Sequence, residues 1–394
     1  MQPTEAAAWL RLITTPGVGP ATARKLLAAF GSPEAVFAAA PAAWEALLGP
    51  RLAPALASAP VALERVLAQT LGWLADAPDR HHLLSLGHPH YPAALLQTPD
   101  PPLLLFVQGQ LPALAHPSAL AIVGSRNPSP QGAENAQAFA RALSQAGCCI
   151  VSGLALGIDG AAHRGALEGS APTLAVLGTG LDRIYPRQHQ ELAQRIAAQG
   201  ALISEYPLGT APLAPHFPQR NRLIAGLSQG TLVVEAALQS GSLITAELAL
   251  QYGREVFAIP GSIHSTQSRG CHALIRQGAK LVESAQDVLE ELRPQQARSA
   301  PLQGQLDWGG LEPAQPVGAT EARARSVPPT RVLPARAAEG ALLQALGYDP
   351  VGLDALQARC GLPTAELQAQ LLELELCGSV RRLPGGLFQR QAQA

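Results

Sequence analysis

Four short loops rich in glycine and serine have the residue types needed to hold phosphate groups. They are Gly124-Ser125-Arg126-Asn127-Pro128-Ser129, the run from Ser152 to Asp159, Gly178-Thr179-Gly180, and Ser240-Gly241-Ser242 with Thr245 one turn later. Glycine lets backbone approach a ligand closely, and a helix that follows such a loop presents free N–H groups and a positive dipole end. Arg126 adds a guanidinium that can donate two hydrogen bonds to one phosphate. A single loop of this kind is a common turn, but four together with an arginine favour a phosphate site.

Further basic groups lie in two other places. The stretch from His216 to Arg222 combines two arginines, an amide and the Phe217 ring just before an apolar run. Phosphate-binding cations beside a stacking ring are typical of proteins that bind single strands, although a solvated helix face has a similar composition. Arg187 follows Tyr185-Pro186 at a predicted helix start, where the macrodipole disfavours a cation. A solvent-facing arginine explains Arg187 equally well.

The loops follow short apolar runs that we expect to be strands. These runs are Leu120–Val123, Cys149–Val151, Thr173–Val176, Ala201–Ser204, Thr231–Val234 and Glu255–Ile259. A turn and an amphipathic helical pattern follow each run, which is typical of βαβ units. Right-handed crossovers bring the carboxyl ends of all parallel strands to one edge of the sheet, where ligands bind. The sequence therefore predicts an α/β, extended Rossmann-like core with the loops at one edge.

Catalytic arrangements do not assemble from these residues. The first strand is followed by neither G-x-G-x-x-G nor G-x-x-x-x-G-K-[ST], the fingerprints of dinucleotide and P-loop sites. Asp159 and His163 are four residues apart, so an ordinary helix-surface pair explains them. No serine lies in a G-x-S-x-G elbow, and His264 and His272 lack metal-ligand spacing. We expect no enzyme activity, no metal and no cofactor.

The composition predicts a folded protein on which any DNA-binding site would be local. The chain has 394 residues, 47% hydrophobic and 14% charged, and a formal net charge of −1. This length indicates two or three domains. A protein that bound nucleic acid through bulk charge would be strongly basic, so a DNA site must be a small patch. Five cysteines without a C-x-x-C pair, and neither a signal peptide nor a membrane-length apolar run, are typical of a cytoplasmic protein.

We predict three domains. Residues 1–77 form a helical, helix-hairpin-helix/SAM-like domain, residues 85–292 the core, 293–337 a flexible proline-rich linker and 338–394 a winged-helix-like domain. In the first domain, the turn Gly17-Val18-Gly19 could present amides to a DNA phosphate, with Lys25 one turn further on. A plain helical corner uses glycine in the same way, so both interpretations stay open.

The C-terminal segment has the order of a winged helix but not its usual charge. Helices are expected at 338–346, 351–360 and 364–377, followed by strands at 379–382 and 387–389 around the turn at 384–386. The helix that would enter a DNA groove carries Glu366, Glu373 and Glu375 and neither lysine nor arginine. DNA phosphates would repel it, which argues against a transcription regulator and favours protein contact or self-regulation.

The order of the core motifs resembles that of the DNA-processing protein A family (DprA, also called Smf). The matching motifs are Gly124-Ser125-Arg126-x-x-Ser129, Ser152-Gly153-x-Ala155-x-Gly157-Ile158-Asp159, Phe217-Pro218-x-Arg220-Asn221-Arg222 with the run 223–228, and Ser240-Gly241-Ser242-x-x-Thr245-Ala246. The resemblance extends over residues 85–292. Arg187 stands where many members have lysine after Tyr-Pro.

This resemblance implies a protein that binds single-stranded DNA, protects incoming DNA, forms a homodimer and loads the RecA recombinase during natural transformation. It implies a DNA groove lined by Gly124, Ser125, Arg126, Arg187, Arg220 and Arg222. The other candidate site residues, from the same motifs, are Ser129, Ser152, Gly153, Gly157, Phe217, Asn221, Gly241, Ser242 and Thr245. The expected dimer surface comprises Leu274, Ile275, Leu281 and Val282, for which burial within one subunit is an equal explanation.

The alternative function is that of a Rossmann-like nucleotide phosphoribohydrolase acting on a nucleoside monophosphate. Such enzymes carry G-G-x-G-T-x-x-E, whose glutamate acts on the ribosyl bond. Here Thr245 stands at the position of that glutamate, and threonine offers no carboxylate. Glu235 is nearby, and we expect it to hydrogen-bond to loop amides.

Overall fold

The computed structural model describes residues 2–292, 342–383 and 386–391. The chain divides into two compact units, one ending at Leu292 and the other formed by C-terminal residues. The predicted linker at 293–337 lies outside the described residues, as do residues 338–341 of the first predicted C-terminal helix. Pro384 and Gly385 of the predicted turn are outside them as well.

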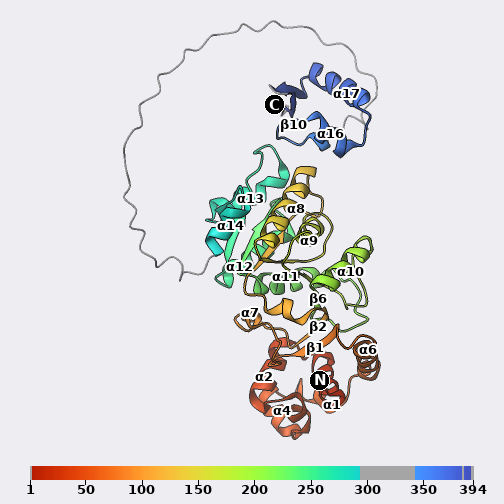
Figure 1. Cartoon of the computed structure of the whole chain (residues 1–394). Helices are drawn as coiled ribbons and strands as arrows, with labels where there is room; N and C mark the ends of the chain where they lie inside the picture. The colour runs from red at the N-terminus through yellow and green to blue at the C-terminus, as the bar shows by residue number, and fades with distance from the viewer. Residues whose placement is uncertain (1, 293–341, 384–385, 392–394) are drawn as a thin grey trace, which may run out of the picture. The chain divides into compact units, whose positions relative to one another are not determined.

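A nine-stranded sheet forms the centre of the first unit (Figure 1). Its strands are β1 (His81–Ser85), β2 (Leu104–Gly109), β3 (Ala119–Val123), β4 (Cys149–Ser152), β5 (Thr173–Val176), β6 (Ala201–Ser204), β7 (Gly230–Val233), β8 (Glu255–Ala258) and β9 (Lys280–Leu281). All six predicted strands, β3 to β8, are present and run parallel to one another. The predicted α/β core is therefore confirmed. β1 and β2 add an antiparallel edge beside β6, and β9 a short parallel one.

The strand order places a topological switch point beside β3. The order is β1-β2-β6-β5-β4-β3-β7-β8-β9, so the chain moves outward from β3 through β4, β5 and β6 and then returns to β7 on the other side of β3. The connections from β3 and β7 leave in opposite directions. A crevice opens between such loops at the carboxyl ends of the strands, and ligands bind there in doubly wound sheets.

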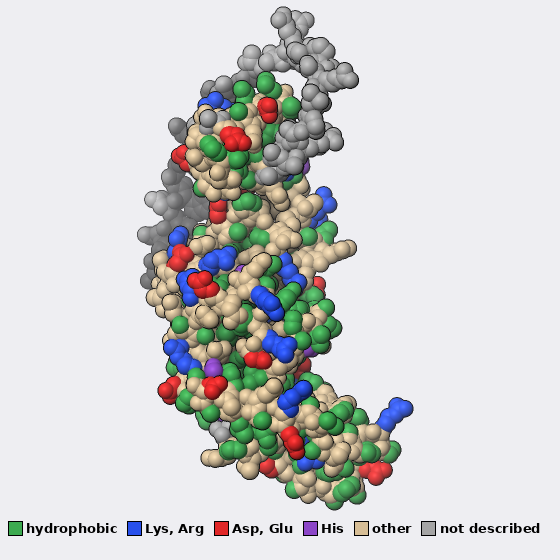
Figure 2. Space-filling view, turned by 90° about the vertical axis from the view of Figure 1, so that its right-hand side faces the viewer, with side chains coloured by type: hydrophobic (Ala, Val, Ile, Leu, Met, Phe, Trp, Pro, Cys, Tyr) green, Lys and Arg blue, Asp and Glu red, His purple; other side chains and the backbone are tan. Residues whose placement is uncertain are grey.

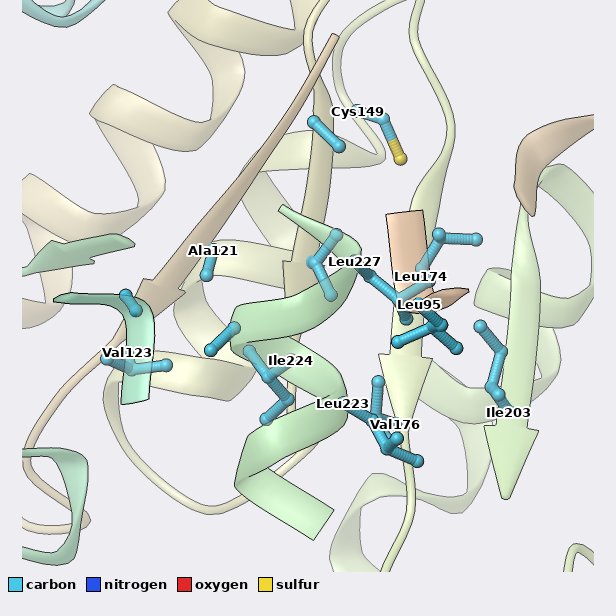
Figure 3. Packing of buried hydrophobic residues seen from close by; sticks show 14 of the residues in the cluster. Leu95, Ala121, Val123, Cys149, Leu174, Val176, Ile203, Leu223, Ile224 and Leu227 are labelled. Carbon is cyan, nitrogen blue, oxygen red and sulfur yellow. The ribbon is translucent and has the colours of Figure 1, made fainter. Parts of the chain in front are cut away.

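Helices cover both faces of the sheet because alternate strand residues point to opposite sides. On one face lie α7 (Ala93–Leu96), α11 (His216–Leu227), α12 (Gly241–Gln251) and α13 (Arg269–Arg276), and on the other α8 (Pro130–Gln145), α9 (Ile158–Ala166) and α14 (Ala285–Leu292). Leu223 and Ile224 of α11 pack near Val123 and Val176 (Figure 3). Ile122, the neighbour of Val123, belongs instead to the cluster of α8 and α9.

The N-terminal helices share a hydrophobic cluster with the antiparallel end of the sheet. They are α1 (Pro3–Thr14), α2 (Pro20–Phe30), α3 (Pro33–Ala38), α4 (Pro41–Leu48), α5 (Ala53–Ala57) and α6 (Leu63–Asp76). Four of them begin with proline, whose fixed φ suits the first helical position. Leu10 and Leu26 join Phe106 of β2 and Ile196 of α10 (Gln190–Gln199) in this cluster. The predicted helical N-terminal domain is confirmed. Three short 3₁₀ helices, η1 (Leu111–Ala115), η2 (Arg187–His189) and η3 (Thr266–Ser268), complete the unit.

The C-terminal unit has the predicted winged-helix architecture. Residues 342–346 are helical, followed by β10 (Val351–Gly352), α16 (Leu353–Cys360), α17 (Thr364–Leu376), β11 (Val380–Leu383) and β12 (Leu387–Arg390). The helix predicted from residue 351 begins two residues later, because Val351 and Gly352 pair with β12. Glu366, Glu373 and Glu375 of α17 are exposed, which leaves its surface acidic. No helix of the described ranges is long and apolar enough to cross a membrane.

Candidate nucleic-acid interface

A pocket of about 520 Å³ lies at the switch point of the sheet. The loop after β3, the loop after β4, the first turns of α11 and the start of α12 form its walls. Nine predicted site residues line it: Gly124, Ser125, Arg126, Phe217, Arg220, Asn221, Gly241, Ser242 and Thr245. Loops that are separated by more than 100 residues in the chain therefore meet where the parallel topology requires.

Arg126 is the exposed cation of this pocket. Its guanidinium lies 5.5 Å from the centroid of the Phe217 ring, within the range of a cation–π contact. Phe217 in turn lies 5.5 Å from the half-exposed ring of Tyr185. None of the ion pairs found among the described residues involves Arg126. A phosphate at this position would thus meet an uncommitted guanidinium beside the Phe217 ring.

Arg220 has a different environment from Arg126, although both line the pocket. Its side chain is 5% exposed, donates a hydrogen bond of 2.6 Å to Val176 O and lies 3.9 Å from the Asp159 carboxylate. Burial lowers the pKa of Arg220 to about 10, and Asp159 opposes that shift, so the side chain stays cationic at neutral pH. Arg220 consequently holds the pocket wall together while presenting a partly neutralised charge.

Ser152, Gly153 and Gly157 lie behind the pocket wall. The Ser152 hydroxyl donates to Ile122 O, a bond between neighbouring strands. A side chain at Gly153 would collide with the Arg220 guanidinium, and Gly157 has a φ of 77°, which favours glycine. These residues shape the loop, but they do not line the pocket.

Ser129 caps helix α8 and is held by Glu235. Its hydroxyl accepts from Gly132 N, while its own N–H and O–H both donate to the Glu235 carboxylate. Burial raises the pKa of Glu235, and the bonds from Ser129 oppose this shift. The expected bonding of Glu235 to a loop amide is confirmed, and neither residue lines the pocket.

Arg222 and Arg187 lie outside the pocket. Arg222 pairs with Glu205 and donates a bond of 2.9 Å to Asp100 O, next to a second cavity of about 500 Å³. Pro20, which follows the Gly17-Val18-Gly19 turn, lines that second cavity, and Arg24 of the same helix pairs with Asp100 at 2.5 Å. The start of α2 therefore faces acidic groups of the core. Arg187 is exposed in η2, two residues beyond Tyr185.

The residues considered for catalysis have other partners. Asp159 accepts hydrogen bonds from the backbone N–H groups of Gly153 and Ala155, whereas His163 bonds to Thr173 Oγ1. The predicted pairing of Asp159 with His163 is wrong, because each side chain turns to a different strand or loop. Thr245 lines the pocket where the alternative function requires a glutamate.

Further lining residues that were not among the predicted site residues include Asn127 and Asp159, which lie within the predicted loops, and Gln239 and Gln267. Gln267 donates to Asn127 O from 140 residues away, a contact with no local signal. Tyr185 was noted only as the neighbour of Arg187, although an aromatic residue before Pro-Arg could have drawn attention to it. On the face shown in Figure 2, basic side chains are scattered among acidic ones without a broad basic surface.

Two of the four predicted dimer residues are internal. Leu274 and Val282 are buried in the core, which corrects their assignment to a surface. Ile275 and Leu281 line a shallow cavity together with Leu238 and Ile263. Leu238, Ile263 and Leu281 are each at least half exposed. An apolar surface does exist near α13, but its composition differs from the predicted one.

Comparison with known families gives three matches along the chain. The family described as DNA recombination-mediator protein A matches residues 82–293. A DprA-like N-terminal HHH domain matches residues 3–60, and a DprA winged helix domain matches residues 325–386.

Individual proteins agree with these matches. Protein Smf of Escherichia coli K12 is 44% identical over 321 residues, which cover 81% of this chain and 80% of that protein. The DNA processing protein DprA of Streptococcus pneumoniae R6 is 51% identical over 51% of this chain and 71% of its own length. The solved DprA structure from S. pneumoniae superposes with a TM-score of 0.62 at 39% identity, covering 74% of this chain and 98% of that one. The structure of DNA processing protein A from Helicobacter pylori, which concerns that protein's unique single-stranded DNA binding mode, superposes with a TM-score of 0.50 at 33% identity. The match covers 54% of this chain and 95% of that one.

Proposed function

The chain belongs to the DNA recombination-mediator protein A family, and on that premise we propose that its core binds single-stranded DNA without breaking a bond in it. The observation that carries this proposal is the pocket at the switch point. There the uncommitted Arg126, the Phe217 ring and the start of α12 face one cavity. This combination suits a phosphate followed by an unpaired base.

Preference for single strands follows from the aromatic groups. Phe217 lines the pocket, and the half-exposed ring of Tyr185 lies 5.5 Å from the Phe217 ring. Bases of a single strand expose their faces and stack on such rings, with about 1–3 kcal/mol per base, whereas duplex bases are already stacked. The formal net charge of the chain is −1, so bulk charge offers little to a duplex.

The absence of catalysis is part of the same proposal. The carboxylate of Asp159 is committed to two backbone N–H groups and lies beside Arg220. Thr245 cannot replace the glutamate of a phosphoribohydrolase. These arrangements support binding over hydrolysis of a ribosyl bond.

Fluorescence anisotropy tests the proposal. Labelled single-stranded and duplex oligonucleotides of equal length are titrated with the full chain at several salt concentrations between about 50 and about 500 mM. We expect tight single-strand binding that weakens as salt rises and clearly weaker duplex binding. Equal affinity for both, or no binding at low salt, contradicts the proposal. In the latter case, release of base from a nucleoside monophosphate is the next assay.

Family membership also supports protection of incoming DNA and loading of RecA in the cytoplasm during natural transformation. RecA filament formation on single strands coated with single-strand binding protein measures loading. We expect the full chain to shorten the lag before RecA hydrolyses ATP, and we expect the lag to stay long with the Arg126→Ala variant. An unchanged lag contradicts the loading role.

A homodimer is the assembly that we propose. The exposed apolar side chains Leu238, Ile263 and Leu281 around one cavity support it, since a self-associating surface would bury them. Two subunits would offer two pockets to one strand and raise the effective affinity.

A further inference from the structure

Two of the helices that begin at the binding edge of the sheet, α8 and α12, differ in what their first turns hold. Helix α8 begins at Pro130, after the Gly124–Ser129 loop, and α12 begins at Gly241, after the loop from β7. A helix start ordinarily has a positive dipole end and backbone N–H groups without intrahelical partners, so each of these two starts is a position where an anion is favoured. Of these two helix starts, that of α12 lines the pocket and that of α8 does not.

The first turn of α8 is already occupied by a carboxylate of the protein. Glu235 accepts from Ser129 N at 2.8 Å and from the Ser129 hydroxyl at 2.5 Å. A Cβ at Gly132 would lie 2.6 Å from both carboxylate oxygens, so Glu235 is packed directly against this turn. The Glu235 backbone oxygen also accepts from Ser125 N at 2.7 Å. One residue therefore holds both ends of the Gly124–Ser129 loop.

The first turn of α12 has no such internal anion. It contains no acidic residue, and its cap is the neutral Ser240. Gly241 is exposed, and a Cβ there would meet nothing within 4 Å. The Asn221 amide bonds to Gly241 O and fixes this turn without filling it.

We propose that Glu235 is a resident anion that replaces a ligand phosphate at the start of α8 and confines phosphate binding to the α12 side of the pocket. In a doubly wound sheet the first βα turn ordinarily receives the phosphate of a free nucleotide. With that position filled, the core rejects free mononucleotides and retains a strand whose phosphates are also held by Arg126 and α12. Glu235 is thus a specificity-determining and positioning residue. This inference rests on the proposed single-strand binding.

Replacement of Glu235 by side chains of different size tests the idea. Glu235→Ala opens the position, whereas Glu235→Gln keeps it filled without charge. Thermal unfolding of both variants and the wild type is followed in sodium phosphate and in sodium chloride at equal ionic strength and pH 7. We expect Glu235→Ala to unfold at a lower temperature in chloride and to recover several degrees in phosphate. Wild type and Glu235→Gln should show only the smaller general effect of phosphate on folded proteins.

Binding of thymidine 5′-monophosphate gives the second readout. By calorimetry we expect at least tenfold tighter binding to Glu235→Ala than to wild type or Glu235→Gln. Equal responses of all three proteins to phosphate and to the nucleotide overturn the proposal. Should Glu235→Ala fail to fold in chloride, Glu235→Ser is tested instead. If phosphate then fails to restore a folded circular dichroism spectrum to Glu235→Ala, the proposal is also overturned.

The outcome is independent of whether the wild type binds single strands. Loss of the proposed function would appear as absent oligonucleotide binding by wild type, whatever phosphate does to the variants. Failure of the Glu235 assignment would appear as an unchanged phosphate response with oligonucleotide binding intact.

Discussion

Arginines that resemble one another in the sequence have distinct roles in the structure. Arg126 is exposed beside an aromatic ring, Arg220 is buried against Asp159, and Arg222 is paired with Glu205 away from the pocket. Guanidinium groups that are already committed to a carboxylate offer a DNA phosphate less than a free one does. Only Arg126 combines exposure with a position in the pocket.

Arg126→Ala should weaken single-strand binding by about one to two orders of magnitude at low salt, because one phosphate contact and one cation–π partner are lost. The slope of log affinity against log salt should fall by roughly 0.7, the value for one contact on a single strand. Arg195→Ala, an exposed arginine of α10, removes the same charge elsewhere and is the control. Similar losses in the two variants would show a non-specific charge effect.

Arg220→Ala should lower stability more than it alters the salt dependence. Its removal leaves the buried Asp159 carboxylate without a cation, at a cost of about 3 kcal/mol. Urea unfolding measures this loss, and adding Asp159→Asn should recover part of it. A variant as stable as wild type that nevertheless fails to bind DNA would identify Arg220 as a direct phosphate ligand.

His163 should make the core sensitive to acid. Burial lowers its pKa to about 3, below the ordinary value of about 6.5 that applies to the unfolded chain. As pH falls below 6.5, the unfolded state takes up a proton that the folded state refuses, so stability is lost. At pH 5.5 the loss from this group is about 1.4 kcal/mol. The urea midpoint should therefore change less between pH 7.5 and pH 5.5 in His163→Gln than in wild type. An equal change in both proteins would contradict the proposed role of His163 in acid sensitivity.

At the level of elements, the turns after the strands decide the shape of the pocket. The turn after β4 contains Gly157, whose left-handed backbone lets Ile158 N reach Ser125 O at 3.1 Å. Arg220 fills the space that a side chain at Gly153 would need. The turn after β4 thus supports the loop after β3, which contains Arg126.

Gly157→Ala should disturb this support. Its Cβ would lie 2.7 Å from Arg126 O, in addition to the strain of a positive φ. Gly147→Ala, with φ of 82° and open space around it, isolates the strain alone at about 1 kcal/mol. We expect a larger fall in melting temperature and weaker DNA binding only for Gly157→Ala. Equal effects would mean that the close approach to the loop is unimportant.

At the level of the whole molecule, the chain consists of two compact units with different surfaces. The first unit contains the pocket and an exposed apolar surface near α13, and the second presents the acidic helix α17. Exposed α17 carboxylates disfavour duplex recognition by this helix, so the pocket of the first unit is the candidate for DNA.

Ile263→Glu should weaken the proposed dimer at least tenfold, because it places a charge within an apolar contact surface. Sedimentation equilibrium of the full chain measures the monomer–dimer constant. Val61→Glu, at a fully exposed position of the N-terminal domain, is the matched control. A constant that is unchanged by Ile263→Glu rules out this surface.

The sequence by itself determined the six parallel strands and the loops of the pocket, because apolar runs, turn residues and right-handed crossovers are local or nearly local constraints. It did not predict β1 and β2, since both are paired antiparallel and lie outside the βαβ pattern that identifies the parallel strands. Only the tertiary structure decided which arginine is free. Arg222 meets Glu205 and Asp100, 17 and 122 residues away, and Arg220 meets Asp159. The residue that neutralises a charge is set by chain packing at long range, and that packing leaves Arg126 without a carboxylate partner among the described residues.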